Sequence, residues 1–220
     1  MSTTKALTPK GAATRQRIIE GTSAEVRERG AAATTLDDVC ARTSTSKSQI
    51  FHYFPGGKEE LLLAVAAYEA DRVLFDQEPY LSSLTSWDAW QGWRDQVVRR
   101  YRKLGVHCPL GVLITELGRK TPAAQALTGQ LLEQWQGRLR AGVTAMQEIG
   151  EISPELDADQ IAASLMATVQ GGVVLLLSTG KSDHLEAALD TSLALLRATA
   201  APAKPRDPEL LHVGASEDPT

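Results

Sequence analysis

The chain has 220 residues, 43% of them hydrophobic and 5% aromatic, and carries a formal net charge of −4. This size allows one large domain or two small ones, and the abundance of Ala and Leu favours helices. The cysteines Cys40 and Cys108 show no zinc or disulfide spacing, which indicates a reducing cytoplasm. The N-terminus has no apolar signal core, and the apolar stretch 161–177 is short and lacks basic flanks, so we expect a buried helix there.

Helical spacing of apolar residues and capping signals recur along the chain, and no βαβ pattern is visible. Thr35, with Asp38 three residues later, and Ser46 are the expected N-caps of two short helices. We expect helices at about 12–29, 36–42, 47–54, 58–75, 86–105, 109–118, 121–149, 157–178 and 182–198. The tail 201–220 contains four prolines among charges and is predicted to be disordered. The fold class is therefore all-α.

Charge is distributed unevenly along the chain. Residues 1–60 carry nine Lys or Arg and seven Asp or Glu, whereas residues 61–220 carry fourteen and twenty. A mildly basic end on an acidic body fits a protein that contacts nucleic-acid phosphate with one end only.

The segment 34–63, TTLDDVCARTSTSKSQIFHYFPGGKEELLL, predicts two short helices joined by a tight Thr-Ser-Thr turn. This arrangement fits the DNA major groove when the second helix exposes small polar and cationic groups. Ile50 and Phe54 are four residues apart and would anchor that helix, which leaves its other face free. The expected DNA-binding residues are Thr35, Thr45, Ser46, Lys47, Ser48, Gln49, Phe51, His52, Tyr53 and Lys58.

Each of these residue types has a reason to contact DNA. Gln suits adenine, Lys suits guanine or phosphate, and Phe can contact a thymine methyl group. His and Tyr can donate to phosphate, and Lys58 beside the amides of the next helix N-terminus would form a phosphate clamp. The alternative, on these residues alone, is an ordinary helical corner with a polar surface.

The same segment resembles the N-terminal domain of the TetR/AcrR family of transcriptional regulators over about residues 14–67. The wording FPGGKEELLL and the later CPLG are similar to the branch with LmrA/YxaF-type repressors. The resemblance implies a three-helix DNA-binding domain with a helix-turn-helix, and a helical C-terminal domain that dimerises and binds a small effector. Three positions depart from the family pattern: Ser44 replaces a turn Gly, Phe51 a Tyr, and Gly57 a capping Ser or Asn.

The stretch 161–177 is apolar nearly all round, so we expect it to be buried on more than one side. Small residues recur every four positions there, and leucines at helical spacing follow in the next helix. Two such helices per subunit would form a four-helix dimer interface; the alternative is packing within one subunit. The expected interface residues are Ala163, Ala167, Gly171, Val174, Leu189 and Leu193.

Aromatic residues in the middle helices could line an effector cavity, together with a few polar groups. Aromatics at helical spacing are more often core residues, so this alternative stays open. The expected effector-binding residues are Trp90, Trp93, Leu113, Trp135 and Gln170.

The sequence therefore predicts a helix-turn-helix domain at 12–57, a ligand-binding and dimerisation domain at 58–200, and the tail. The expected function is a cytoplasmic, homodimeric repressor that binds a near-palindromic operator on double-stranded DNA and is released by a small hydrophobic effector. An activator, or a ligand-binding protein without DNA-binding activity, is the alternative. No catalytic motif is present, so we expect no enzyme activity, and we expect no cofactor, metal or membrane partner.

Overall fold

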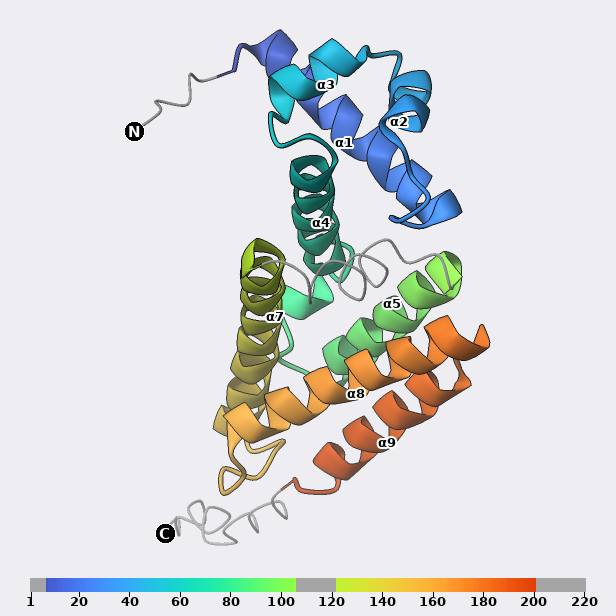
Figure 1. The fold of residues 1–220 in the computed structure, drawn as a ribbon. Coiled ribbons are helices and arrows are strands. Elements are labelled where there is room, and N and C mark those ends of the chain that lie inside the picture. The colour runs from blue at the N-terminus through green and yellow to red at the C-terminus, as the bar shows by residue number, and fades with distance from the viewer. Residues whose placement is uncertain (1–6, 106–121, 201–220) are drawn as a thin grey trace, which may run out of the picture.

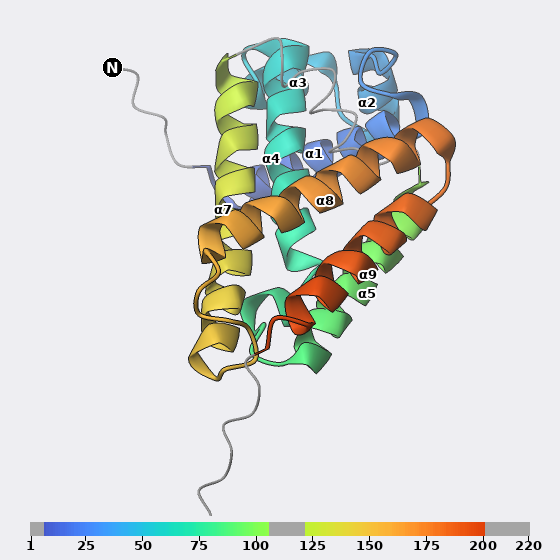
Figure 2. The ribbon, with the colours of Figure 1, turned by 90° about the horizontal axis from the view of Figure 1, so that it is seen from below.

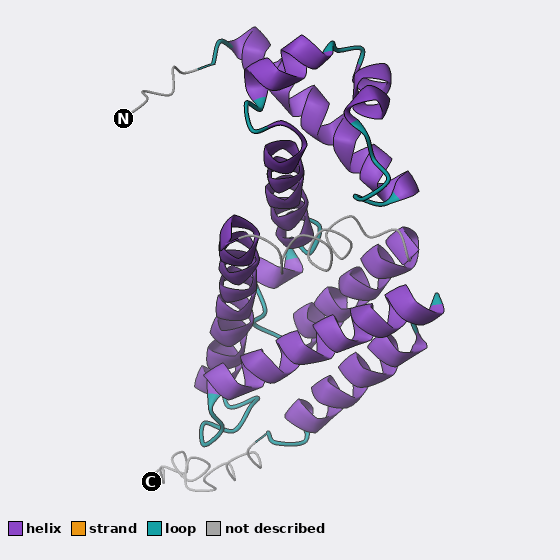
Figure 3. Cartoon of the chain, in the orientation of Figure 1, coloured by secondary structure: helices purple, strands orange, loops and turns teal. Residues whose placement is uncertain are grey.

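The computed structural model describes residues 7–105 and 122–200, which form helices and loops without a strand (Figure 3). The first three helices are α1 (Pro9–Arg29), α2 (Leu36–Thr43) and α3 (Lys47–Tyr53). The others are α4 (Gly57–Phe75), the short 3-10 helix η1 (Tyr80–Ser82), α5 (Trp87–Leu104), α7 (Pro122–Glu148), α8 (Ala158–Thr179) and α9 (Asp183–Arg197). The expected all-α fold is confirmed. The helix predicted at 109–118 and the tail lie outside the described residues.

Local capping explains where the N-terminal helices begin. Helix α1 starts at Pro9, three residues before the expected start, because the Thr8 hydroxyl accepts a hydrogen bond from the Gly11 amide at 3.2 Å. Helices α2 and α3 both begin with complete capping boxes, at Thr35 and at Ser46. Both N-caps are as predicted, whereas the reciprocal bond between Gln49 and Ser46 was not predicted.

Two separate hydrophobic cores hold the chain together, and α4 contributes to both. Its first half supplies Leu61 and Val65 to the core under α1, α2 and α3, which we call the reading head. Its second half supplies Val73 and Leu74 to the larger core of α5, α7, α8 and α9, which we call the body. Figure 1 shows α4 running from the head at the top into the body below. The head is therefore joined to the body by one uninterrupted helix.

Helices α8 and α9 lie side by side on the outside of the body, and α5 packs behind α9 (Figure 2). Their close approach depends on Gly172, because a Cβ there would lie 2.7 Å from the Leu185 Cα. Helix α8 is also long and apolar enough to cross a membrane, with a mean hydropathy of 1.8, but one such helix is weak evidence for a span. Only 39% of the residues in its apolar window are buried within the chain, fewer than the sequence predicts.

Candidate nucleic-acid interface

The turn between α2 and α3 is built from hydroxyl side chains. Ser44 ends α2 in the left-handed conformation, with φ 51° and ψ 46°, at the position where the sequence departs from the usual Gly. Thr43 donates to the Val39 carbonyl at 2.7 Å, and its hydroxyl lies 2.7 Å from that of Thr45. Thr45 is 9% exposed. The expectation that Thr45 faces DNA is therefore corrected: its hydroxyl is used inside the turn.

Helix α3 is anchored by the two residues that the sequence predicts. Ile50 and Phe54 are both 0% exposed, and the Arg15 guanidinium lies 4.9 Å from the centre of the Phe54 ring. The opposite face of α3 and its N-cap is open to solvent. Its exposed residues are Ser46, Lys47, Ser48, Gln49, Phe51 and His52. This face is short, polar and cationic, with one aromatic ring that is 48% exposed.

Two of these exposed side chains already have partners within the head. The Gln49 Oε1 accepts from the Ser46 amide at 2.9 Å. This bond does not use the Nε2 donors of Gln49, which can still bind a base. The Lys47 Nζ lies 2.9 Å from Asp37 Oδ1, and the hydrogen bond to Asp37 raises the pKa of that lysine. Both partners of this ion pair are exposed, so it contributes little to stability and DNA phosphate can compete for the ammonium group.

The remaining predicted contacts lie at the edge of this face. Thr35 is exposed but its hydroxyl caps α2, and Tyr53 is half-buried with its ring 4.8 Å from that of His52. Lys58 donates to the Ala32 carbonyl at 3.2 Å. At the start of α4 the Gly56 amide donates to the Glu60 carboxylate at 2.7 Å. Two groups of the predicted phosphate clamp, the Lys58 ammonium and the Gly56 amide, therefore already have hydrogen-bond partners within the chain.

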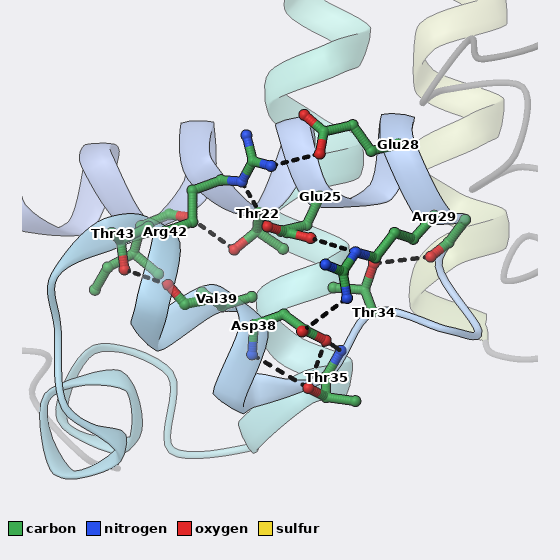
Figure 4. Close-up of polar contacts among 12 residues, drawn as sticks. Thr22, Glu25, Glu28, Arg29, Thr34, Thr35, Asp38, Val39, Arg42 and Thr43 are labelled. Carbon is green, nitrogen blue, oxygen red and sulfur yellow. Dashed lines mark hydrogen bonds and ion pairs between the residues drawn. The ribbon is translucent and has the colours of Figure 1, made fainter.

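Ion pairs between α1 and α2 brace the helix-turn-helix (Figure 4). Arg42 on α2 donates to Glu25 at 2.6 Å and to Glu28 at 2.5 Å. Arg29 lies 3.3 Å from the other Glu25 oxygen and donates to Asp38 at 2.9 Å. The Glu25 side chain is only 5% exposed, and both of its oxygens lie next to an arginine. Sequence reasoning missed this network, because its members come from two helices whose packing no local pattern specifies.

The same network affects the start of α2. The pKa of Asp38 is lowered because the Thr35 hydroxyl and backbone amide donate to its carboxylate, and Arg29 adds a favourable charge. The carboxylate therefore serves both as the N3 member of the capping box and as a partner of α1.

The described linings of the cavities between the helices include none of the predicted effector residues. Trp90 and Trp93 are 0% exposed and Trp135 is 1% exposed, so these aromatics lie in the core of the body, as the alternative expects. An effector contact of these residues stays a prediction. Trp93 donates to Gln77 Oε1 at 2.7 Å. Gln170 is half-buried on α8, and Leu113 lies outside the described residues. A cavity of about 590 Å³ lies instead between α1, α4 and α5, and its described lining includes none of these residues.

The predicted dimer residues divide into two groups. Ala163, Ala167, Gly171 and Val174 are exposed along one side of α8. Leu189 is 0% exposed and Leu193 7% exposed, so these two pack within the subunit and do not present a surface to a partner. The exposed apolar face continues instead through Leu175 on α8, and α9 exposes Leu195 separately.

Comparison with known proteins agrees with this geometry. The family model "Bacterial regulatory proteins, tetR family" matches residues 18–65, and "Tetracyclin repressor-like, C-terminal domain" matches residues 88–192. The chain belongs to the TetR family. It is a DNA-binding transcriptional regulator of that family, with the helix-turn-helix at α2 and α3. The more specific resemblance to LmrA/YxaF-type repressors stays a prediction.

Individual relatives cover most of this TetR-family chain. An uncharacterized HTH-type transcriptional regulator of Mycobacterium tuberculosis is 26% identical over 168 residues, covering 73% of this chain and 82% of its own. The crystal structure of a TetR-family regulator from Cytophaga hutchinsonii is 22% identical, covers 90% of this chain and 100% of its own, and has a TM-score of 0.76. The SmeT–triclosan complex is 18% identical with a TM-score of 0.67, and covers 89% of this chain and 98% of its own. Both structures share the fold.

Proposed function

We propose that this regulator is a homodimeric repressor that binds a near-palindromic operator through α3 and leaves it when a small effector binds. The observation that carries the DNA-binding part is the α3 face, which is open while Ile50 and Phe54 hold the helix from behind. A helix of this kind enters the major groove with its N-terminal residues against base edges. We assign base contacts to Ser46, Lys47, Ser48, Gln49 and Phe51, and backbone contacts to Thr35, His52, Tyr53 and Lys58.

The exposed side of α8 supports the homodimer. Val174 is 55% exposed and Leu175 42% exposed, and burial of such side chains is favourable. A Cβ added at Gly171 would meet nothing within 4 Å, so packing within the subunit does not require a glycine there. Close approach of a second α8 would require it, because a helix pair crosses tightly only over small residues. A dimer with two-fold symmetry would then place its two α3 helices on DNA half-sites that are one helical turn, or a multiple of it, apart.

Release by an effector requires a coupling between two sites. An effector that binds the DNA-incompetent state about 100-fold more tightly supplies about 2.7 kcal/mol, and DNA weakens effector binding by the same factor. The fold shared with the SmeT–triclosan complex supports a small-molecule partner here. We place the head at 12–57 and the ligand-binding body at 58–200, and we infer that the protein acts in the cytoplasm.

Selection of genomic DNA fragments by the purified protein at two salt concentrations tests the proposal. Recovery of one short inverted repeat, with an affinity that falls steeply as salt rises, is the expected result. Recovery of half-sites alone would contradict a dimeric reader. Recovery of no fragment above background would instead favour a ligand-binding protein without DNA-binding activity.

The dimer is tested separately by Val174→Glu, with Gln130→Glu as a matched control on the exposed side of α7. Two glutamates placed in a two-fold interface bring like charges together, so we expect Val174→Glu to sediment as a monomer and the control as a dimer. A Val174→Glu protein that stays dimeric at micromolar concentration would exclude this face of α8.

A further inference from the structure

The cavity between the end of α1, the second half of α4 and the end of α5 is strongly cationic. It measures about 590 Å³, which is within the range of small-molecule sites. Five basic residues are part of its described lining: Arg27, Arg72, Arg99, Arg100 and Lys103. A pocket with an excess of one sign of charge concentrates ligands of the opposite sign.

The carboxylates of the same lining do not neutralise these cations. They are Glu69, Asp76 and Glu78, and Glu78 is already paired with Arg138 of α7, outside the described lining. Among the described residues neither Arg99 nor Lys103 pairs with a carboxylate. The cavity therefore keeps an excess of positive charge.

Two of the arginines also have hydrogen-bonding capacity to spare. Arg100 is 9% exposed and pairs with Asp76 through its Nη1 atom, while its Nε has no acceptor among the described residues. The Arg27 Nε is buried and likewise has no acceptor there. A buried donor without a partner costs free energy, which an anionic ligand near these guanidinium groups can recover by rearranging them.

The rest of the lining is apolar. Phe75 is 75% exposed at the end of α4, and Pro79 and Leu104 complete the apolar wall. An exposed Phe next to a cluster of cations fits a ligand with an apolar body and an anionic head.

We propose that this cavity binds an organic anion, a carboxylate or phosphate monoester with an apolar body, as the effector. The inference rests on the proposed function and replaces the small hydrophobic effector with an amphipathic one. Its link to DNA binding is Glu69, which is 1% exposed and accepts a hydrogen bond from Ser23 of α1. Arg27 of α1 lies 3.8 Å from Glu69 Oε1, and Arg100 of α5 lies 4.0 Å from Oε2. An anion that draws Arg27 and Arg100 toward itself weakens both pairs and loosens the head from the body.

Calorimetric titration of the full-length protein, without DNA, tests the site directly. The probes are decanoate and decyl phosphate, with decanol as the neutral compound of the same chain length. We expect at least one anion to bind once per chain and decanol to bind at least about 10-fold more weakly, because its neutral hydroxyl cannot form an ion pair with the lining cations. The two anions distinguish a carboxylate from a phosphate head.

Variants locate the binding. Arg27→Gln and Lys103→Gln each remove one lining cation, and we expect each to weaken anion binding about 10-fold. Arg102→Gln is the matched control, since it removes a cation next to Lys103 that pairs with Glu186 of α9 instead of lining the cavity. Equal affinities in the three variants would overturn the assignment, as would tight binding of decanol or the failure of both anions to saturate the protein at millimolar concentration.

The coupling is then measured on the recovered operator. The anion is expected to weaken operator binding about 10-fold in the wild type and in Arg102→Gln, but not in Arg27→Gln, as reciprocal linkage requires. Anion binding that leaves operator affinity unchanged would overturn the effector role. Because the titration uses no DNA, a failed operator selection leaves the result for the cavity unaffected.

Discussion

Two buried glutamates, one in the reading head and one where the head meets the body, are held differently. Glu25 in the head has arginine nitrogens at 2.6 and 3.3 Å from its two oxygens. Glu69 at the junction has arginine nitrogens only at 3.8 and 4.0 Å, although its burial is similar. Because attraction between charges rises as they approach, the ion pairs of the first site are stronger than those of the second, where the Ser23 hydroxyl is the nearest partner of Glu69. The chain thus combines a braced reader with a junction that can rearrange.

The largest expected effect is a loss of stability in the reading head that leaves the body unchanged. Phe54→Ala removes a fully buried ring from the small core of the head and should cost about 3–5 kcal/mol. All four tryptophans follow residue 86, so their fluorescence reports on the body alone, whereas circular dichroism reports on all helices. In urea we expect helix content to fall before tryptophan fluorescence changes. Coincident transitions in the variant would mean that head and body unfold as one cooperative unit.

A second substitution tests whether DNA reading belongs to α3. Gln49→Ala removes a proposed base contact worth about 1–3 kcal/mol, a loss of roughly 5- to 150-fold in operator affinity per contact. Gln49→Glu is the control for folding, because Glu at the same position retains the capping box with Ser46 but cannot donate to a base. Both variants should lose affinity in fluorescence anisotropy while helix content stays the same. Unchanged affinity in both would exclude Gln49 as a base contact.

Acid tests the bracing of the head. The pKa of Asp38 is lowered in the folded protein, so its stabilising contribution is complete above the ordinary value of 3.8 and is lost as pH falls through the lower folded value. The urea midpoint of the head should therefore fall more steeply in the wild type than in Asp38→Asn as the solution is acidified. Parallel pH profiles for the two proteins would show that the Thr35 and Arg29 contacts do not favour the charged form.

The smallest expected effect concerns the turn. Ser44→Gly removes the cost of a left-handed non-glycine residue. The greater entropy of Gly in the unfolded chain offsets part of this gain, so we expect the head to be stabilised by about 0.5–1 kcal/mol. Ala13→Gly, on an exposed position inside α1, should destabilise it by about 1 kcal/mol. Thermal melts of the two variants should move in opposite directions. A lower melting temperature for Ser44→Gly would mean that the Ser44 side chain stabilises the turn.

Local signals were enough to predict most of the head. The caps at Thr35 and Ser46 and the anchors Ile50 and Phe54 each depend on neighbours within a few residues, so the sequence contains all the information needed. Thr45 was placed on the wrong side because hydroxyl groups suit both a turn and a DNA contact.

The junction and the body were less predictable. The cavity combines residues of α1, α4 and α5, and its charge emerges only when those helices pack together. Trp90 and Trp135 are of a residue type that often lines ligand sites, but both lie in the core. Their burial depends on which helices cover them, and the local sequence does not specify this. For the same reason the leucines of α9 were assigned to an interface although α8 already covers them.

Helix α4 sets the scale of the motion that regulation would require. It runs for 19 residues without interruption, which at 1.5 Å per residue is about 28 Å. A pivot of about 5° at its body end displaces its head end by about 2.5 Å, and the two-fold axis of a dimer doubles this to about 5 Å between the reading helices. The half-sites of an operator are held about 34 Å, or a multiple of that distance, apart by the pitch of DNA. In the proposed dimer, a rotation of this size would therefore put the two reading helices out of register with the operator.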